Sequence, residues 1–227
     1  MKENKLNSVH LDGFLEGLQY ESQSSDGAVA WASVVTLHPK SAADGGRNLS
    51  DQFSYLHHDV RLTASDRDGV AALRKVWDGY SEVKGTSALY PCSVSGMLVV
   101  EGNDSFVSCD AGNFLRTDSV KTNDNNIVNI EGNLVSVAIR RFHAALDIEL
   151  KEGVLKALVY MKENPAVWEK LSRGEFRKGD VLYLNGPLLS QRMTDGQTTL
   201  KMCAVSPHLV QKRQLDKKIR KKGSQTV

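Results

Sequence analysis

Residues 178–205 read KGDVLYLNGPLLSQRMTDGQTTLKMCAV. Apolar residues alternate with polar ones on both sides of a central Thr194-Asp195-Gly196-Gln197 segment, and this alternation has the period of a strand. Asp and Gly tolerate the positive φ angles that tight hairpin turns require, so the central segment predicts a turn. Lys178-Gly179-Asp180 predicts another sharp turn just before the first strand. The stretch therefore predicts two strands joined as a hairpin.

A nine-residue pattern occurs twice in the chain. Asn7–Leu15 reads NSVHLDGFL and Asn126–Leu134 reads NIVNIEGNL, so both have the form N-x-V-x-(L/I)-(D/E)-G-x-L at an offset of 126 − 7 = 119 residues. The alternating Val, Leu or Ile, and Gly positions indicate a strand, and a glycine inside a strand marks a bulge or a sharp coil. We infer that the chain contains two copies of one unit.

Each copy continues with a helix pattern. Residues 66–80, DRDGVAALRKVWDGY, have an acidic start and place apolar side chains at helical spacing on one face. In the second copy Asn164-Pro165 starts a shorter helix, because proline fits the first turn, where its missing N–H is not needed. Trp77 and Trp168 lie on the apolar faces of these helices, so we assign both rings to the core.

The strands after the two helices align through glycines. Gly96 follows Trp77 by 19 residues and Gly186 follows Trp168 by 18, so we assign both glycines to the same strand of each copy. The pattern of each copy therefore predicts three strands, a helix and two more strands, which is the order of elements in an OB-fold. The second and third strands are predicted at Val29–Leu37 and Tyr55–Thr63 in the first copy, and at Phe142–Leu150 and Val154–Met161 in the second.

The three cysteines, Cys92, Cys109 and Cys203, form no CxxC pair, which favours a reduced, cytoplasmic protein. Cys109 and Cys203 fall at matching places in the last strand of each copy, so we interpret the three cysteines as small buried hydrophobes. No apolar run approaches the ~18 residues of a membrane span. No apolar segment follows the lysines at the N-terminus, so we expect neither a secretory signal nor a membrane partner.

Residues 178–205 and the repeated pattern resemble the bacterial single-stranded DNA-binding protein family. In that family an N-x-V-x-L-x-G-x-L first strand, a KG-x-x-V/L-x-h-x-G-x-L strand and a T-D-G-x-x-T hairpin close a five-stranded OB barrel. The resemblance covers most of residues 5–210 and is strongest in the second copy. It implies an all-β fold with one short helix per repeat, as two tandem five-stranded OB barrels. We expect a first domain at 1–116, a linker at 117–125, a second domain at 126–210 and a basic tail at 211–227, with no sheet crossing the linker.

The resemblance also implies a function. Family members bind and protect single-stranded DNA without sequence preference during replication, recombination and repair, and they do so without catalysis or a cofactor. They commonly assemble four OB-folds, so a chain with two is expected to form a homodimer. RNA remains an alternative ligand, and replication or recombination proteins are candidate partners. The family usually ends in an acidic tail with a final Pro-Phe, whereas this chain ends KKIRKKGSQTV, which puts partner recruitment in doubt and suggests a divergent or mobile-element-borne member.

Charge is unevenly distributed along the chain. Residues 212–222 contain seven cations and one anion, and removing them from the 29 cations and 27 anions leaves 22 and 26, a net charge of about −4. The body is therefore not a strongly basic nucleic-acid binder, and binding there depends on local cations and aromatic stacking. The basic tail either adds phosphate contacts or is a solvated end.

An OB barrel binds across its second and third strands and the loops beside them, where rings stack on bases and cations hold phosphates. Trp31 and Tyr160 fit either this face or the core, and the two arginines at 140–141 also fit a solvated strand end. The candidates in the first copy are Trp31, Phe53, Tyr55 and Arg61, with His57 and Asp59 in the same strand phase. Those in the second copy are Arg140, Arg141, Lys156, Tyr160, Arg192 and Lys201.

Enzymatic and metal-binding interpretations find little support. The sequence contains no GxSxG, P-loop or HExxH motif. His57 and His58 would point to opposite faces of a strand, and Asp59 with Arg61 is more typical of a surface ion pair than of a nuclease site. We therefore expect no catalytic residue, no metal and no cofactor. The competing hypothesis is an OB-fold adaptor that binds replication or conjugation proteins and touches nucleic acid weakly, which the near-neutral charge of the body favours.

Overall fold

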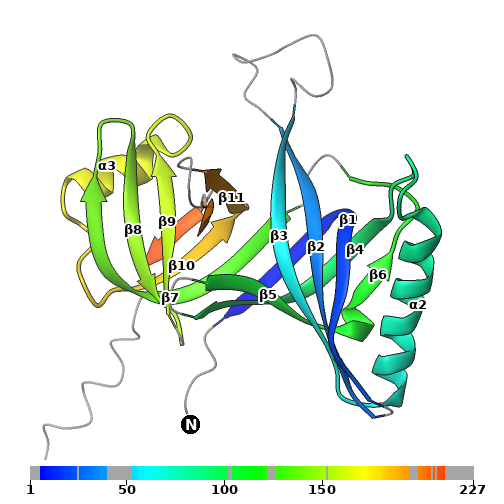
Figure 1. Cartoon of the computed structure of the whole chain (residues 1–227). Coiled ribbons are helices and arrows are strands. Elements are labelled where there is room, and N and C mark those ends of the chain that lie inside the picture. Colours follow the sequence, from blue (N-terminus) through cyan, green and yellow to red (C-terminus); the bar gives the residue numbers. More distant parts are fainter. Residues whose placement is uncertain are drawn as a thin grey trace, which may run out of the picture.

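The computed structural model describes residues 6–24, 26–39, 53–101, 104–121, 126–151, 153–194, 199–205, 207 and 209–212. Within these residues the chain is mostly strand, and Figure 1 shows two curved groups of strands joined at the centre of the molecule. None of the helices found there is long and apolar enough to span a membrane. The all-β class is as expected.

Five strands of the first copy close a ring, here called the first barrel. β1 pairs with β2 and β4, β2 pairs with β3, β3 runs parallel to β5, and β5 pairs back to β4. This closure is that of an OB barrel. The bounds are β1 Asn7–Gln23, β2 Ala28–Pro39, β3 Phe53–Ala64, β4 Pro91–Glu101, β5 Asp104–Asp110, the short 3-10 helix η2 Ala111–Asn113 and β6 Phe114–Arg116.

Helix α2 (Arg67–Val83) lies between β3 and β4 in the chain, where the apolar spacing predicted it. The Asp66 side chain caps it by accepting a hydrogen bond from the Gly69 N–H at 2.7 Å. Three of its side chains are buried, and Trp77 packs half-buried with its ring centroid 5.1 Å from that of Tyr20. The core assignment of Trp77 is confirmed.

The second copy forms a second barrel of the same design. β7 pairs with β8, β8 with β9, β9 runs parallel to β12, and β12 pairs with β11, while β10, joined to β11 through Pro187, pairs with β7. Trp168 packs partly buried against its core, as expected. The bounds are β7 Asn126–Ile139, β8 His143–Glu149, β9 Val154–Tyr160, α3 Pro165–Ser172, β10 Val181–Gly186, β11 Leu188–Thr194, β12 Thr199–Val205 and β13 Leu209–Lys212.

Strand register confirms the 119-residue offset. Val9 pairs with Gly96, and Val128, its counterpart 119 residues on, pairs with Gly186. The register of the first strand also shifts at the same place in both copies, after Leu15 and after Leu134. The assignment of both glycines to one strand position was therefore correct.

The repeated glycine and asparagine have structural roles. A Cβ on Gly13 would meet the Val35 carbonyl, and one on Gly132 would meet Ile148, so both first strands need glycine to bend against the second strand. The Asn7 amide donates to the Leu98 carbonyl at 2.7 Å and accepts from the Leu98 N–H at 3.0 Å. Asn126 makes the same two bonds to Leu188, at 2.7 and 2.9 Å.

The cysteine alignment was wrong. Leu98 pairs with Val107 and Leu188 pairs with Val205, so the two valines occupy equivalent positions. Cys109 lies two residues after its valine, whereas Cys203 lies two residues before its own. Only residue type linked the two cysteines, and no strand register supported the match. Cys109 and Cys92 are buried, and burial raises the pKa of each thiol to about 12.

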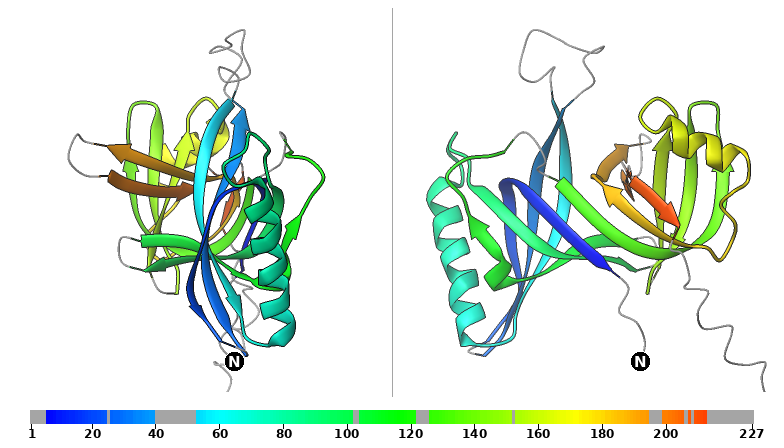
Figure 2. Two further views of the ribbon diagram at one scale, coloured as in Figure 1. Left: turned by 45° about the vertical axis from the view of Figure 1, so that its right-hand side comes forward. Right: turned by 180° about the vertical axis from the view of Figure 1, so that it is seen from behind.

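One sheet joins the two barrels, contrary to expectation. β1 pairs antiparallel with β7 around a central Val9–Val128 pair, so the sheet continues from one copy to the other. Figure 2 shows this junction from behind. Pairing covers strand edges that would otherwise present free backbone groups. Leu155 and Leu188 of the second barrel also belong to the buried cluster of the first, so a division into two separate domains remains a prediction.

The described part of the expected linker, 117–121, is held by the first barrel. The Thr117 N–H donates to the Pro91 carbonyl at 3.0 Å, and Lys121 Nζ lies 2.8 Å from the buried Asp12 carboxylate. Burial raises the pKa of Asp12, but hydrogen bonds from Lys121 and Ser93 and the charge of His10 outweigh it and hold the pKa below its ordinary value.

Candidate nucleic-acid interface

The outward side chains of β1, β2, β3 and β5 form a surface that we call the first face. In β3, Leu56, His58, Val60 and Leu62 are buried, so the predicted phase with Tyr55, His57, Asp59 and Arg61 outward is confirmed. His58 Nε2 is hydrogen-bonded to Thr36 Oγ1, 2.9 Å away inside the barrel. The first face consists of Glu16, Glu21, Trp31, His57, Asp59, Arg61 and Phe106.

Trp31 is at the centre of the first face. It stands opposite Arg61 in the β2–β3 register, and the guanidinium carbon lies 5.9 Å from the ring centroid. Phe106 of β5 meets the ring edge-on, with centroids 5.1 Å apart. Trp31 is half-buried and points outward, so it supports a binding surface and does not fill the barrel. Sequence reasoning missed Phe106, because only the parallel β3–β5 pairing brings β5 beside this face.

Carboxylates of β1 border this aromatic cluster. The Trp31 Nε1–H donates to Glu21 Oε2 at 3.0 Å, and the same oxygen lies 3.7 Å from Arg61 Nε. Glu16 Oε2 lies 3.0 Å from His57 Nδ1 and accepts from the Ser33 hydroxyl at 3.3 Å. A groove of about 320 Å³ adjoins the cluster, with Trp31, Ser33, Asp59 and Lys84 among its lining.

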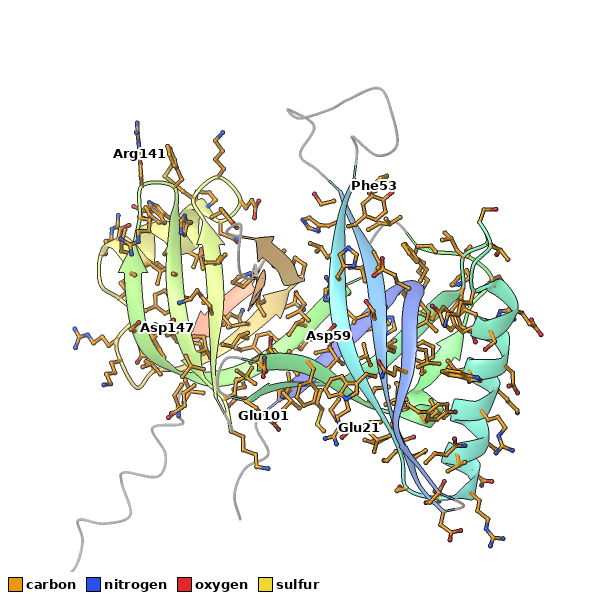
Figure 3. All side chains as sticks on the ribbon, viewed as in Figure 1. Glu21, Phe53, Asp59, Glu101, Arg141 and Asp147 are labelled. Carbon is orange, nitrogen blue, oxygen red and sulfur yellow. The ribbon has the colours of Figure 1, made fainter. Side chains whose placement is uncertain are left out.

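Phe53 and Tyr55 lie away from this cluster. Tyr55 is 51% exposed, and at ~3.3 Å per residue it stands about 20 Å along β3 from Arg61. Figure 3 shows Phe53 at one end of β3 and Asp59 further along the same strand, toward Glu21 of β1. The structure therefore brings Trp31 and Arg61 together but leaves Phe53 and Tyr55 at the end of the hairpin.

Side chains on the turn from β7 to β8 and on the outside of β8 and β9 form the second face. Leu155, Ala157 and Val159 are buried, so Lys156 and Tyr160 point outward as predicted. The Tyr160 ring faces that of His143 at 5.9 Å, and burial raises the pKa of its phenol. The second face consists of Arg140, Arg141, Phe142, His143, Asp147, Lys156 and Tyr160.

Two exposed arginines and a ring mark the turn between β7 and β8. Arg140 and Arg141 are exposed, and the Arg141 guanidinium carbon lies 4.9 Å from the centroid of Phe142. Phe142 is 60% exposed, an unusual state for a ring of this size. Sequence reasoning assigned Phe142 to a strand and missed it as a site residue, although its place between Arg141 and His143 was a signal.

Lys156 is ion-paired. Its ammonium lies 2.8 Å from Asp147, which also accepts from the Ser136 hydroxyl at 2.6 Å. The hydrogen bonds from Lys156 and Ser136 hold the pKa of Asp147 below its ordinary value. A phosphate at Lys156 must therefore compete with this carboxylate.

Arg192 and Lys201 stand opposite each other on the β11–β12 hairpin, but their side chains lie outside the described residues. The basic tail beyond Lys212 lies outside them too. Lys212 itself binds Asp180 at 2.7 Å. Among the residues that the structure describes, no three His, Cys, Asp or Glu side chains gather in a way that would hold a metal ion.

The two faces are not copies of each other. The paired registers make Val34 equivalent to Ile148, so Trp31 corresponds to Ala145, three positions earlier. By the same registers Arg61 corresponds to Leu158. The aromatic cluster therefore lies mid-sheet in the first barrel and near the β7–β8 turn in the second.

Two solved structures are similar to this chain over nearly its whole length. One is the wild-type single-stranded DNA binding protein from Thermus aquaticus, with a TM-score of 0.59 and 16% identity over 93% of this chain and 94% of that one. The other is a deletion mutant of the Thermus aquaticus protein, with a TM-score of 0.56 and 17% identity over 93% and 96%. No protein-family model and no curated protein sequence matches. The chain thus has the OB-type fold of a bacterial single-stranded DNA-binding protein, as the sequence resemblance implied.

Proposed function

We propose that this chain binds single-stranded DNA without sequence preference and that it has no catalytic activity. The observation that carries the proposal is an outward aromatic ring with an arginine against it in each barrel. Arg61 lies 5.9 Å from the ring of Trp31, and Arg141 lies 4.9 Å from the ring of Phe142. A ring that stacks a base beside a cation that holds a phosphate is the basic unit of single-strand binding.

Both the choice of a single strand and the lack of sequence preference follow from stacking. Bases in a duplex already stack on each other, so only an unpaired strand can offer their faces to Trp31 or Phe142. Every base has such a face, and stacking therefore discriminates little among sequences. The fold shared with the Thermus aquaticus protein supports this assignment.

The wider role is part of the same proposal. We place the chain in the protection of single strands during replication, recombination or repair in the cytoplasm, with two OB domains per chain and a homodimer supplying four. Replication or recombination proteins are the candidate partners. The support is the shared fold, whose family commonly acts in this way.

Titration of a fluorescently labelled oligothymidine with the purified full chain, at two salt concentrations, tests the proposal. We expect saturable binding that weakens with salt by ~0.7 in log K per log salt for each phosphate contact. An unlabelled duplex should compete poorly and an unlabelled single strand well. No binding at low salt would contradict the proposal.

A protein adaptor is the second candidate, and one observation favours it. The first face carries Glu16, Glu21 and Asp59 against the single cation Arg61, a net charge of −2 with histidine neutral. Such a surface repels phosphate and suits a basic protein partner. Binding confined to the second face in the titration, unchanged by substitutions of Trp31, would favour the adaptor role for the first.

A further inference from the structure

Glu21 lies on the first face between Trp31 and Arg61. Its Oε2 accepts the Trp31 indole N–H at 3.0 Å and stands 3.7 Å from Arg61 Nε. These are the ring and the cation that the proposed function assigns to base and phosphate. One oxygen of Glu21 therefore contacts both the indole of Trp31 and the guanidinium of Arg61.

The contact between Glu21 and Arg61 leaves the arginine incompletely satisfied. At 3.7 Å the pair is an ion pair without a hydrogen bond. Arg61 Nε is buried and, within the described chain, has no hydrogen-bond partner. A buried donor without an acceptor carries a desolvation cost, which an oxygen at hydrogen-bonding distance would remove. A phosphate oxygen is such an acceptor, and its charge-assisted bonds to arginine are short and strong.

The Glu21 carboxylate can also separate from Arg61 without disturbing the fold. Its side chain is 48% exposed and that of Arg61 is 37% exposed, so the pair lies at the surface. Ion pairs of this kind contribute little to stability, and salt screens them. Exchange of the carboxylate for a phosphate therefore costs the fold little.

We propose that Glu21 is an intramolecular competitor of nucleic-acid phosphate, and that it sets the affinity of the first face by occupying Arg61. This inference rests on the proposed function and adds a residue that tunes it. When a nucleic-acid strand binds here, its phosphate replaces the Glu21 carboxylate at Arg61. Arg61 therefore contributes less to affinity and to salt dependence than an arginine without a carboxylate partner would. Glu21 is a positioning residue, because it acts through Arg61 and Trp31.

Glu21→Gln tests the inference, since glutamine still accepts the Trp31 N–H but carries no charge. We expect oligothymidine binding about fivefold to tenfold tighter at low salt, the gain of roughly one freed charge contact. The slope of log K against log salt should steepen by ~0.7. Asp26→Asn is the matched control, because Asp26 is an exposed carboxylate of the same barrel that pairs with an arginine, Arg67, at 3.4 Å and belongs to neither face. It should change affinity by less than about twofold.

A cycle with Arg61→Gln separates competition from general repulsion. In the Arg61→Gln background, Glu21→Gln should give no gain. A gain that persists there, an equal gain from Asp26→Asn, or weaker binding by Glu21→Gln would each overturn the inference while binding of the DNA strand itself remains. If neither the parent chain nor any variant binds the strand, the proposed function fails and the inference fails with it. Thermal melting of each variant confirms that the fold is intact.

Discussion

Tyr160 is the residue at which the second face is most directly tested. Its ring points outward beside His143, while Val159 next to it fills the barrel. We predict that Tyr160→Ala weakens oligothymidine binding by roughly 1–3 kcal/mol, the contribution of stacking one base. Thermal stability should stay close to that of the parent, because removal of an outward ring leaves no internal cavity. Fluorescence titration and thermal melting measure the two effects.

Two variants serve as controls for Tyr160→Ala. Tyr160→Phe keeps the ring and should keep most of the affinity. Lys156→Ala should cost less than Tyr160→Ala and act mainly on the salt slope, because Asp147 already holds the ammonium at 2.8 Å. Full stability of Tyr160→Ala with undiminished affinity would mean that this face binds something other than nucleic acid.

At the scale of elements, the asparagine that opens each repeat fastens two strands together. Asn126 is buried and makes both of its bonds to the backbone of Leu188, just past the point where β10 passes into β11 at Pro187. Asn7 does the same for Leu98 of β4. The repeated pattern thus encodes a barrel closure and no part of the binding face.

We predict that Asn126→Ala lowers the free energy of unfolding by about 1–3 kcal/mol, because it leaves a buried backbone N–H and carbonyl of Leu188 without partners. Chemical denaturation measures the change. Asn133→Ala is the control, since Asn133 lies on the same strand but its side chain donates to the exposed Glu149 side chain, at 3.1 Å, and not to a buried backbone group. Equal losses in both variants would show that the closure does not depend on these bonds.

Local signals predicted the elements well. Period-two alternation placed β3 and β9 in the correct phase, and the acidic cap with spaced apolar residues placed α2. Trp31 and Arg61, both named as candidates from the sequence, stand opposite each other on neighbouring strands.

Long-range contacts escaped prediction for a physical reason. Phe106 reaches Trp31 only through the parallel β3–β5 pairing, and a single sequence carries no register between distant strands. Glu21 is nearer, in the β1–β2 hairpin, but it lies where the register of β1 shifts, between Tyr20 and Ser22, and simple alternation does not predict that shift. The β1–β7 pairing was missed for the same reason, because backbone pairing at a strand edge depends on no particular residue type that would identify the partner strand. The mismatch of Cys109 and Cys203 is a different error, because two residues of the same type were assigned to the same structural position.

The whole molecule presents two faces of opposite charge balance. The second face has Arg140, Arg141 and Lys156 against Asp147, a net charge of +2, where the first has −2. In Figure 1, β8 and β9 lie toward the viewer together with β2 and β3, so the two faces share one side of the molecule. We therefore expect one DNA strand to contact both faces, with its phosphate contacts concentrated on the second face and base stacking on Trp31 at the first.

The central claim is that the outward faces of both barrels bind a single strand, and photocrosslinking tests it most directly. The full chain is irradiated with an oligothymidine that carries 5-iodouracil, and the crosslinked residues are mapped by mass spectrometry. We predict crosslinks at Trp31 or Phe106 on the first face and at Phe142 or Tyr160 on the second. Crosslinks confined to the α2 side of the molecule, at Trp77 or Tyr90, would contradict the account.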